Sequence, residues 1–162
     1  MELNLINIIT LAYIGDSVYE VYVREYLIRN GIAKVEELQK EAVKYVSAKS
    51  QSRILSYLID NNLLNEIELD IVKRGRNYKR NSHPKNTDII TYKMSTGFEA
   101  MIGYLYMNNS KDRLNEIMNY ILGGIYEKLF KEIYSWSTVL WHDIFCFATG
   151  CHLFTGCKCE LY

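Results

Sequence analysis

Two acidic residues, Asp16 and Glu99, each lie in a run of apolar residues that has the spacing of a helix; the runs are Leu11–Glu20 and Ser95–Tyr106. Burying a lone carboxylate costs several kcal/mol unless a partner or a cation neutralises it. Two such acids in one chain suggest a shared divalent cation, because carboxylate oxygens are the ligands that Mg²⁺ prefers. The pattern therefore predicts a metal-dependent enzyme.

Each acid also has a purely structural interpretation. The segment Thr96–Glu99 matches a capping box, in which Glu99 would only bond a backbone amide at the start of a helix. Asp16 follows Gly15 and would complement the helix dipole if it lay in a first turn. Spacing alone leaves both interpretations open.

Composition and periodicity predict one helical domain. The chain has 162 residues, of which 49% are hydrophobic and 23% charged, and it contains one proline. These values are ordinary for a soluble protein that is large enough to form a core. Apolar residues recur at helical spacing along most of the chain, and no strand-type alternation stands out. The predicted fold class is all-α.

Turn-forming residues divide the chain into five expected helices. The first has an inward stripe of Leu11, Ile14, Val18 and Val21 and ends at residues 30–31. The second and third span residues 35–58 and 63–78, and an exposed loop follows over residues 79–86. The fourth carries Glu99 and ends near residues 108–109. The fifth starts at Ser110 as its cap and stops at residues 123–124.

Positive charge is concentrated between residues 72 and 93, although the formal net charge of the whole chain is zero. The segment has one acid, Asp88, and seven cations: Lys73, Arg74, Arg76, Lys79, Arg80, Lys85 and Lys93. Seven minus one gives +6 there, and therefore about −6 on the rest of the chain. This asymmetry is typical of a face that binds a polyanion. The alternative is an ordinary solvated charged surface.

The end of the chain differs in kind from the rest. Residues 133–162 contain both tryptophans, two of the three histidines and all four cysteines. We expect a main domain over residues 1–132 and an atypical Cys/Trp-rich tail, lineage-specific or aberrant, over residues 133–162. A zinc site that uses Cys157 and Cys159 together with Cys151 and His152 is a weaker alternative, because the spacing lacks paired zinc knuckles. A membrane anchor is also weaker, because polar residues dilute the apolar run below the ~20 residues that a spanning helix needs.

The cysteines and the start of the chain indicate the compartment. No basic-then-apolar leader opens the sequence, and the first 145 residues contain no cysteine. Disulfides therefore do not hold the main fold together, and we expect a cytoplasmic protein with no membrane partner.

Five segments resemble motifs of the ribonuclease III endonuclease domain. LAYIGDSVYEVYVREYL, from Leu11, is similar to the family's L-E-F-L-G-D-A/S-V, and STGFEAMIGYLYM, from Ser95, is similar to D-A-F-E-A-L-I-G-A-I-Y. Three further segments resemble Y-V-S-A-K, R-G-R-N and P-K-N-T-D of the short bacterial branch, the Mini-ribonucleases III: Tyr45–Lys49, Arg74–Asn77 and Pro84–Asp88. This branch lacks the double-stranded RNA-binding domain. The motifs occur in the family's order over about residues 5–124.

The resemblance implies a ribonuclease III-like helical bundle in which Asp16 and Glu99 are both catalytic and metal-binding. Asp16 would be a direct ligand that helps to orient the attacking water, and Glu99 would hold the same ion or a second one. The expected ion is Mg²⁺, with Mn²⁺ as a substitute. Ala12 and Thr96 stand where larger relatives carry the second acid of each pair. This departure leaves open how many ions the protein holds.

The resemblance also implies double-stranded RNA as the substrate. A-form RNA is recognised through phosphates and 2′-hydroxyls, which suits cationic and amide side chains. The candidate RNA-binding residues are Lys49, Arg74, Arg76, Asn77, Lys79 and Lys85. A two-fold homodimer would place one site on each strand. Tyr13 is the candidate dimer contact, and core packing is its alternative.

The expected activity is that of a magnesium-dependent endoribonuclease that matures the 23S (large-subunit) ribosomal RNA precursor at its base-paired ends. The alternative is a non-catalytic RNA-binding module with the same fold. Whether a ribosomal protein bound to the substrate is a further partner stays open, as does the exact cleavage site.

Overall fold

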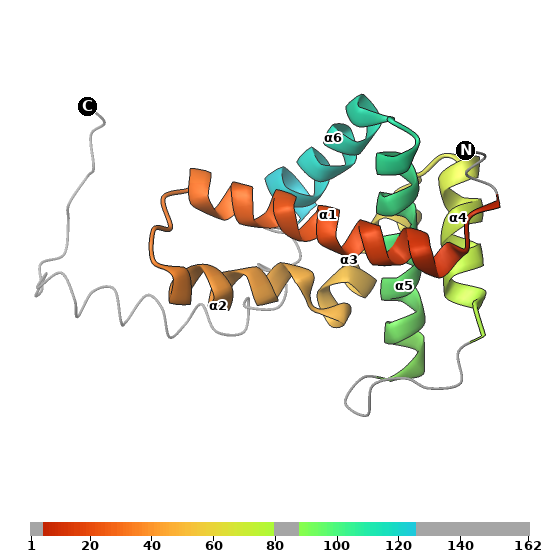
Figure 1. The fold of residues 1–162 in the computed structure, drawn as a ribbon, viewed down its shortest axis with the longest axis horizontal. Helices are drawn as coiled ribbons and strands as arrows, with labels where there is room; N and C mark the ends of the chain where they lie inside the picture. The colour runs from red at the N-terminus through yellow and green to blue at the C-terminus, as the bar shows by residue number, and fades with distance from the viewer. Residues whose placement is uncertain (1–4, 80–87, 126–162) are drawn as a thin grey trace, which may run out of the picture. The chain divides into compact units, whose positions relative to one another are not determined.

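The computed structural model describes residues 5–79 and 88–125, with the backbone alone for residues 124 and 125. Its elements are α1 (Ile8–Arg29), α2 (Val35–Val46), α3 (Ala48–Asp60), α4 (Glu66–Asn77), α5 (Ile89–Met107), α6 (Lys111–Tyr120) and the π-helix η2 (Ile121–Ile125) (Figure 1). No strand occurs in these two described ranges, so the all-α prediction is confirmed. The predicted tail, with its zinc and membrane alternatives, and the predicted loop at residues 80–86 lie outside the described residues.

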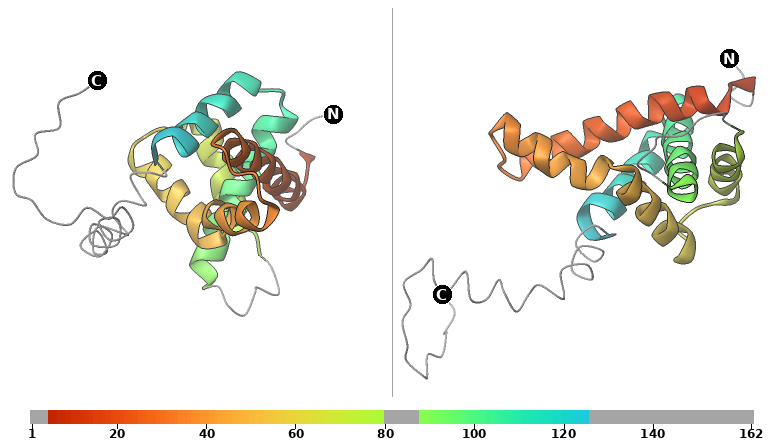
Figure 2. Two further views of the ribbon diagram at one scale, coloured as in Figure 1. Left: turned by 90° about the vertical axis from the view of Figure 1, so that its left-hand side faces the viewer. Right: turned by 90° about the horizontal axis from the view of Figure 1, so that it is seen from below.

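Helix α5 is the central element. It packs against α1, α3, α4 and α6, and the views in Figures 1 and 2 show α1 crossing it while α4 runs alongside it. Because neighbours cover several sides, α5 is apolar around most of its circumference. Its Phe98 packs edge-on against Tyr19 of α1, with ring centroids 4.9 Å apart. The core therefore surrounds the middle of α5, next to Glu99.

Several predicted helix ends are confirmed by the local geometry. Helix α1 ends at Asn30 and is followed by Gly31, whose φ of +91° is a conformation that glycine adopts without strain. Helix α5 ends at Asn108 and is followed by Asn109, with a φ of +56°. At its other end, the side chain of Asp88 accepts a hydrogen bond from the backbone N–H of Thr91 at 2.9 Å. Asp88 is therefore the N-cap of α5.

The single helix predicted over residues 35–58 is wrong, because the chain breaks at Ser47. This residue is extended (φ −63°, ψ 144°), and its hydroxyl accepts a hydrogen bond from the backbone N–H of Ser50 at 3.4 Å. Ser47 thereby ends α2 and caps α3. The apolar spacing continues through the break, which is why periodicity alone joined the two helices.

Ser110 is the N-cap residue of α6 as predicted, although its side chain makes no capping hydrogen bond. Two smaller expectations are wrong. The chain does not stop being helical at Gly123, since α6 passes directly into η2, which includes this glycine. In the first helix Leu11 and Val18 are buried as predicted, but Val21 is 62% exposed. Helix α1 is apolar on more than one face, so its sequence marks the inward face poorly.

Candidate active site

The two predicted acids lie on the two helices that cross at Gly15, Asp16 on α1 and Glu99 on α5. A Cβ added at Gly15 would lie 1.8 Å from the carbonyl oxygen of Glu99, and one added at Gly103 would lie 1.9 Å from the carbonyl oxygen of Leu11. Only glycine allows such an approach of two backbones. Asp16 follows Gly15 in the chain, and Glu99 is the residue whose backbone Gly15 touches. The crossing therefore brings the backbones at Asp16 and Glu99 close together from distant parts of the sequence.

Both capping interpretations of these acids are wrong. Helix α1 begins at Ile8 with Asn7 as its cap, and α5 begins at Ile89 with Asp88 as its cap. Asp16 and Glu99 therefore lie in the interiors of their helices, more than two turns from either start. Neither carboxylate is needed to satisfy a helix end.

The environment of Asp16 is mixed. Asp16 as a whole residue is exposed, although it lies in an apolar run of the sequence. Glu99 is half-buried. Burial of part of the Asp16 carboxylate raises its pKa; a hydrogen bond from Gln51 lowers the pKa, and the charge of Glu20 raises it further. The Gln51 amide nitrogen Nε2 donates this bond to Oδ1 of Asp16 at 3.5 Å.

Gln51 is a site residue that the sequence analysis missed. It lies on α3 and is 1% exposed. Its position belongs to the buried stripe of α3, which also contains Ile54, Leu55 and Leu58. A polar side chain on an apolar stripe is the signal that could have identified it.

The positions where the resemblance implies further acids in larger relatives carry no carboxylate in this chain. Ala12 and Thr96 are both buried, and the Thr96 hydroxyl donates to the carbonyl oxygen of Tyr92 at 3.0 Å. Among residues 5–79 and 88–125, no group of three or more His, Cys, Asp or Glu side chains could hold a metal ion. Two carboxylates nevertheless fit Mg²⁺, which keeps several of its waters and takes few protein ligands.

Helix α4 approaches α5 in a similar way. A Cβ added at Gly75 would lie 2.9 Å from the Cα of Gly97, and one added at Gly97 would lie 2.9 Å from the carbonyl oxygen of Val72. Arg74 and Arg76 flank Gly75. Helix α5 is therefore contacted by α1 at Glu99 and by α4 at Gly97, and the last turn of α4 is basic.

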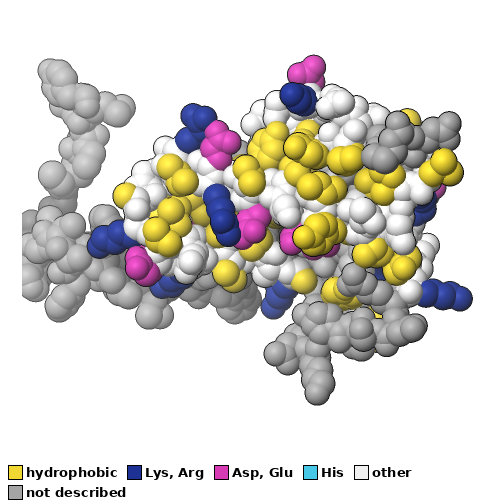
Figure 3. Space-filling view, in the orientation of Figure 1, with side chains coloured by type: hydrophobic (Ala, Val, Ile, Leu, Met, Phe, Trp, Pro, Cys, Tyr) yellow, Lys and Arg dark blue, Asp and Glu magenta, His cyan; other side chains and the backbone are white. Residues whose placement is uncertain are grey.

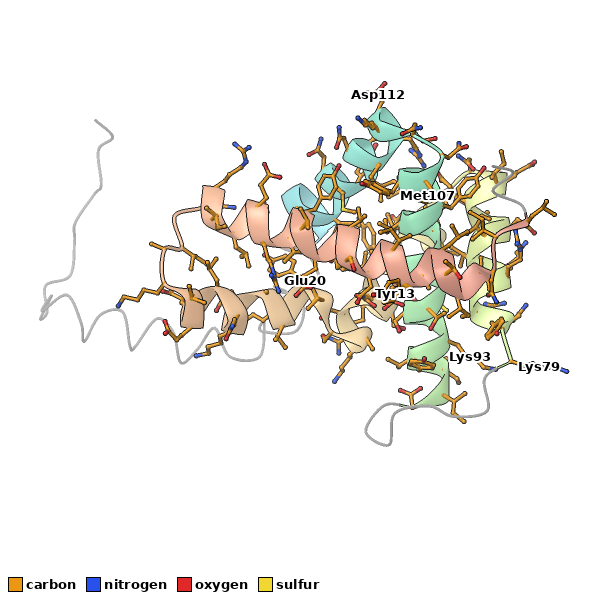
Figure 4. All side chains as sticks on the ribbon, in the orientation of Figure 1. Tyr13, Glu20, Lys79, Lys93, Met107 and Asp112 are labelled. Atoms are coloured by element: carbon orange, nitrogen blue, oxygen red, sulfur yellow. The ribbon has the colours of Figure 1, made fainter. Side chains whose placement is uncertain are left out.

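The structure gathers only some of the candidate RNA-binding residues. Arg76, Asn77 and Lys79 are exposed at the C-terminal end of α4, and Arg74 is half-buried there. Figure 4 shows Lys79 and Lys93 near the same end of the molecule. Of the other two candidates, Lys49 is exposed on a different helix, α3, two residues before Gln51, and Lys85 lies outside the described residues.

Tyr13 is 79% exposed on α1, so the core-packing alternative for this residue is wrong. Val21 and Ile28 of the same helix are also exposed. Figure 3 shows hydrophobic side chains on the face along which α1 runs. An exposed apolar stripe of this kind is typical of an interaction surface.

Comparison with known proteins identifies the family. The ribonuclease III domain matches residues 9–110, which is more than half of the chain, and the chain therefore belongs to the ribonuclease III family and is an endoribonuclease. Its relatives include proteins named Mini-ribonuclease 3. That of Streptococcus pneumoniae is 45% identical over 75% of this chain and 95% of its own length. That of Staphylococcus aureus is 42% identical over 78% of this chain and 95% of its own length.

A solved structure supports the same assignment. The crystal structure of a protein from Fusobacterium nucleatum is 30% identical to this chain and superposes with a TM-score of 0.67, covering 76% of this chain and 97% of that one. The ribonuclease III-like bundle predicted from the motifs is confirmed. In the described part of the chain, no helix is long and apolar enough to cross a membrane.

Proposed function

We propose that the protein is a magnesium-dependent endoribonuclease that cleaves double-stranded RNA, with Asp16 and Glu99 as its catalytic and metal-binding residues. The α1–α5 crossing carries this proposal, because Asp16 follows Gly15 and the backbone of Glu99 lies against Gly15. Two carboxylates in the interiors of adjacent helices, with no capping role, are a fitting donor set for a hard divalent cation.

The proposed residues divide the chemical work between them. Mg²⁺ would activate water and offset the negative charge on the scissile phosphate and on the departing 3′ oxygen. Asp16 and Glu99 would hold the ion, and Asp16 would help to orient the attacking water. Because both acids come from the interiors of packed helices, their backbones are already fixed before substrate binds.

The basic residues would hold the RNA backbone. Arg76, Asn77 and Lys79 are exposed on or just after α4, which packs against the helix that carries Glu99. Phosphate and 2′-hydroxyl contacts would fix the position of a duplex without reading its sequence. The remaining proposed contacts are Lys49, Arg74 and Lys85.

We further propose a two-fold homodimer in which each protomer cuts one strand. The exposure of Tyr13, and of Val21 and Ile28 on the same helix, supports an α1 interface. The proposed substrate is the 23S ribosomal RNA precursor at its base-paired ends, by likeness to the Mini-ribonucleases. A ribosomal protein on that RNA is a further proposed partner, and the proposed compartment is the cytoplasm.

The test is cleavage of a labelled RNA duplex in the presence of Mg²⁺, with EDTA and a single-stranded RNA as controls. We expect Asp16→Asn and Glu99→Gln each to slow cleavage by about 100-fold or more while binding of the duplex is retained. The matched control is Glu25→Gln, because Glu25 is an acid of α1 that pairs with exposed Arg29.

Three results would contradict the proposal. The first is cleavage at the wild-type rate by either acid variant, and the second is cleavage by the wild-type protein in EDTA. The third is an intact duplex that the wild-type protein binds but does not cut, which would favour a non-catalytic RNA-binding module.

A further inference from the structure

Gln51 has an environment that packing alone does not explain. Its side chain is 1% exposed on the buried stripe of α3, where Ile54, Leu55 and Leu58 are its companions. An amide in such a position loses its hydration and must regain its hydrogen bonds from the protein.

The hydrogen bonds of Gln51 are incomplete. Its nitrogen Nε2 donates to Oδ1 of Asp16 at 3.5 Å, which is a long bond. Its oxygen Oε1 is buried and has no hydrogen-bond partner in the described part of the chain. A leucine or methionine would fill the same space without leaving an unsatisfied acceptor. The fold alone therefore gives no reason for an amide at this position.

The direction of the amide follows from its neighbour. If Oε1 faced the Asp16 carboxylate, two acceptors would meet with no proton between them, so the NH₂ group must face Asp16 when this acid is ionised. Among the described residues, Gln51 makes the one side-chain hydrogen bond that the Asp16 carboxylate receives. Gln51 is thus a buried, fixed donor aimed at an exposed acid.

We propose that Gln51 is a positioning residue, whose buried amide holds the Asp16 carboxylate in the orientation that binds the divalent ion. It acts through Asp16 and touches neither the ion nor the RNA. This inference rests on the proposed metal-binding role of Asp16. A site with two protein carboxylates depends strongly on the orientation of each, and partners that orient metal ligands typically change metal affinity or activity by about 10- to 100-fold.

The test is Gln51→Met, which keeps the length of the side chain and removes both the donor and the unsatisfied acceptor. We expect the melting temperature in EDTA to be unchanged or higher. The Mg²⁺ concentration that gives half of the Mg²⁺-induced rise in melting temperature should increase about 10- to 100-fold. The Mg²⁺ concentration for half-maximal cleavage should increase in parallel. The matched control is Gln39→Met, because Gln39 is an exposed glutamine of α2.

A second variant pair separates action through Asp16 from other effects. In an Asp16→Asn background, adding Gln51→Met should change the Mg²⁺ dependence of melting no further, because the group that it positions is already gone. An additional change of the full single-variant size would overturn the proposal.

The remaining outcomes are also decisive. An unchanged Mg²⁺ requirement of Gln51→Met would overturn the proposal. If its melting temperature were also lower, the result would show that Gln51 has a structural role. If Gln51→Met fails to fold, Gln51→Leu takes its place, and failure of both to fold would show that the amide serves the fold. A wild-type protein with neither cleavage nor a Mg²⁺-induced rise in melting temperature would instead overturn the proposed function.

Discussion

Two acids of this protein, Glu68 and Asp16, contact neighbouring helices in very different ways. Glu68 is 1% exposed at the start of α4. Its Oε2 accepts from the backbone N–H of Asn65 at 2.8 Å, and the Asn65 side chain accepts from the N–H of Glu68 at 2.9 Å, which together form a capping box. Arg113 of α6 adds two charge-assisted bonds, from Nε to Oε1 at 2.8 Å and from Nη2 to Oε2 at 2.9 Å.

Asp16 has none of this support. Its carboxylate receives one long side-chain bond, from Gln51, and is partly buried, although the residue as a whole is exposed. The Glu68 carboxylate raises the pKa of Arg113 above its usual value, whereas partial burial raises the pKa of Asp16 itself. The comparison shows that a structural acid is surrounded by donors, while the proposed catalytic acid receives a single long side-chain hydrogen bond among the described residues.

The largest expected effect is on the structural acid. Arg113→Ala would leave Glu68 charged, buried and without its ion-pair partner, which typically costs about 3–5 kcal/mol of unfolding free energy. Urea denaturation of the metal-free protein measures this loss. The control is Arg24→Ala, because Arg24 pairs with Glu20 on the exposed surface and should cost about 0–1 kcal/mol. Equal losses of unfolding free energy for Arg113→Ala and Arg24→Ala would show that the buried Glu68 ion pair stabilises the fold no more than an exposed one.

The next effect concerns the helix crossing that holds the proposed site. Gly15→Ala would place a methyl group 1.8 Å from the carbonyl oxygen of Glu99, so α1 and α5 must separate. We expect a loss of about 1–3 kcal/mol, measured by the same denaturation experiment, together with slower cleavage. Gly123→Ala is the control, since a Cβ there meets nothing within 4 Å. A Gly15→Ala protein with wild-type stability and activity would contradict the importance of this contact.

A smaller effect, of opposite sign to that at Glu68, is expected for Asp16→Asn. The folded-state pKa of Asp16 is raised, chiefly by partial burial, so its ionised form is disfavoured in the fold, and removing the charge should raise the melting temperature in EDTA at pH 7. The gain should be full above the folded pKa and disappear as pH falls below the unfolded value of about 3.9. Glu68→Gln should instead lower the melting temperature at pH 7. Destabilisation by both substitutions would show that Asp16 also supports the fold.

The smallest effect is on salt dependence. Arg76→Glu should weaken binding of an RNA duplex and reduce the slope of log K against log salt by about one, because one phosphate contact is lost. Lys111→Glu is the control, since Lys111 adjoins Asp112, which Figure 4 shows at the opposite end of the molecule from Lys79 and Lys93. An unchanged slope for Arg76→Glu would exclude Arg76 as a phosphate contact.

The sequence predicted the features that depend on local rules. The two acidic motifs, the helix ends at Asn30 and Asn108 and the all-α class all follow from short-range patterns of residues. The break at Ser47 was missed because the apolar spacing runs through it, so the local capping signal was outweighed.

Features that depend on contacts between distant segments could not be predicted in the same way. The pairing of Glu68 with Arg113 and the contact of Gln51 with Asp16 join different helices, and no periodicity encodes them. The exposure of Val21 depends on which sides of α1 its neighbours cover. The family motifs indicated that Asp16 and Glu99 belong together, but only the glycine crossing supplied the physical reason.

Calorimetric titration with Mn²⁺ of the wild-type protein, Asp16→Asn, Glu99→Gln and the double variant decides whether the two acids hold one ion. If the two acids hold one ion, each single substitution should weaken Mn²⁺ binding by at least about tenfold, and the double variant should be little weaker than either single variant. Wild-type Mn²⁺ affinity in either single variant would contradict the claim that Asp16 and Glu99 form one metal site.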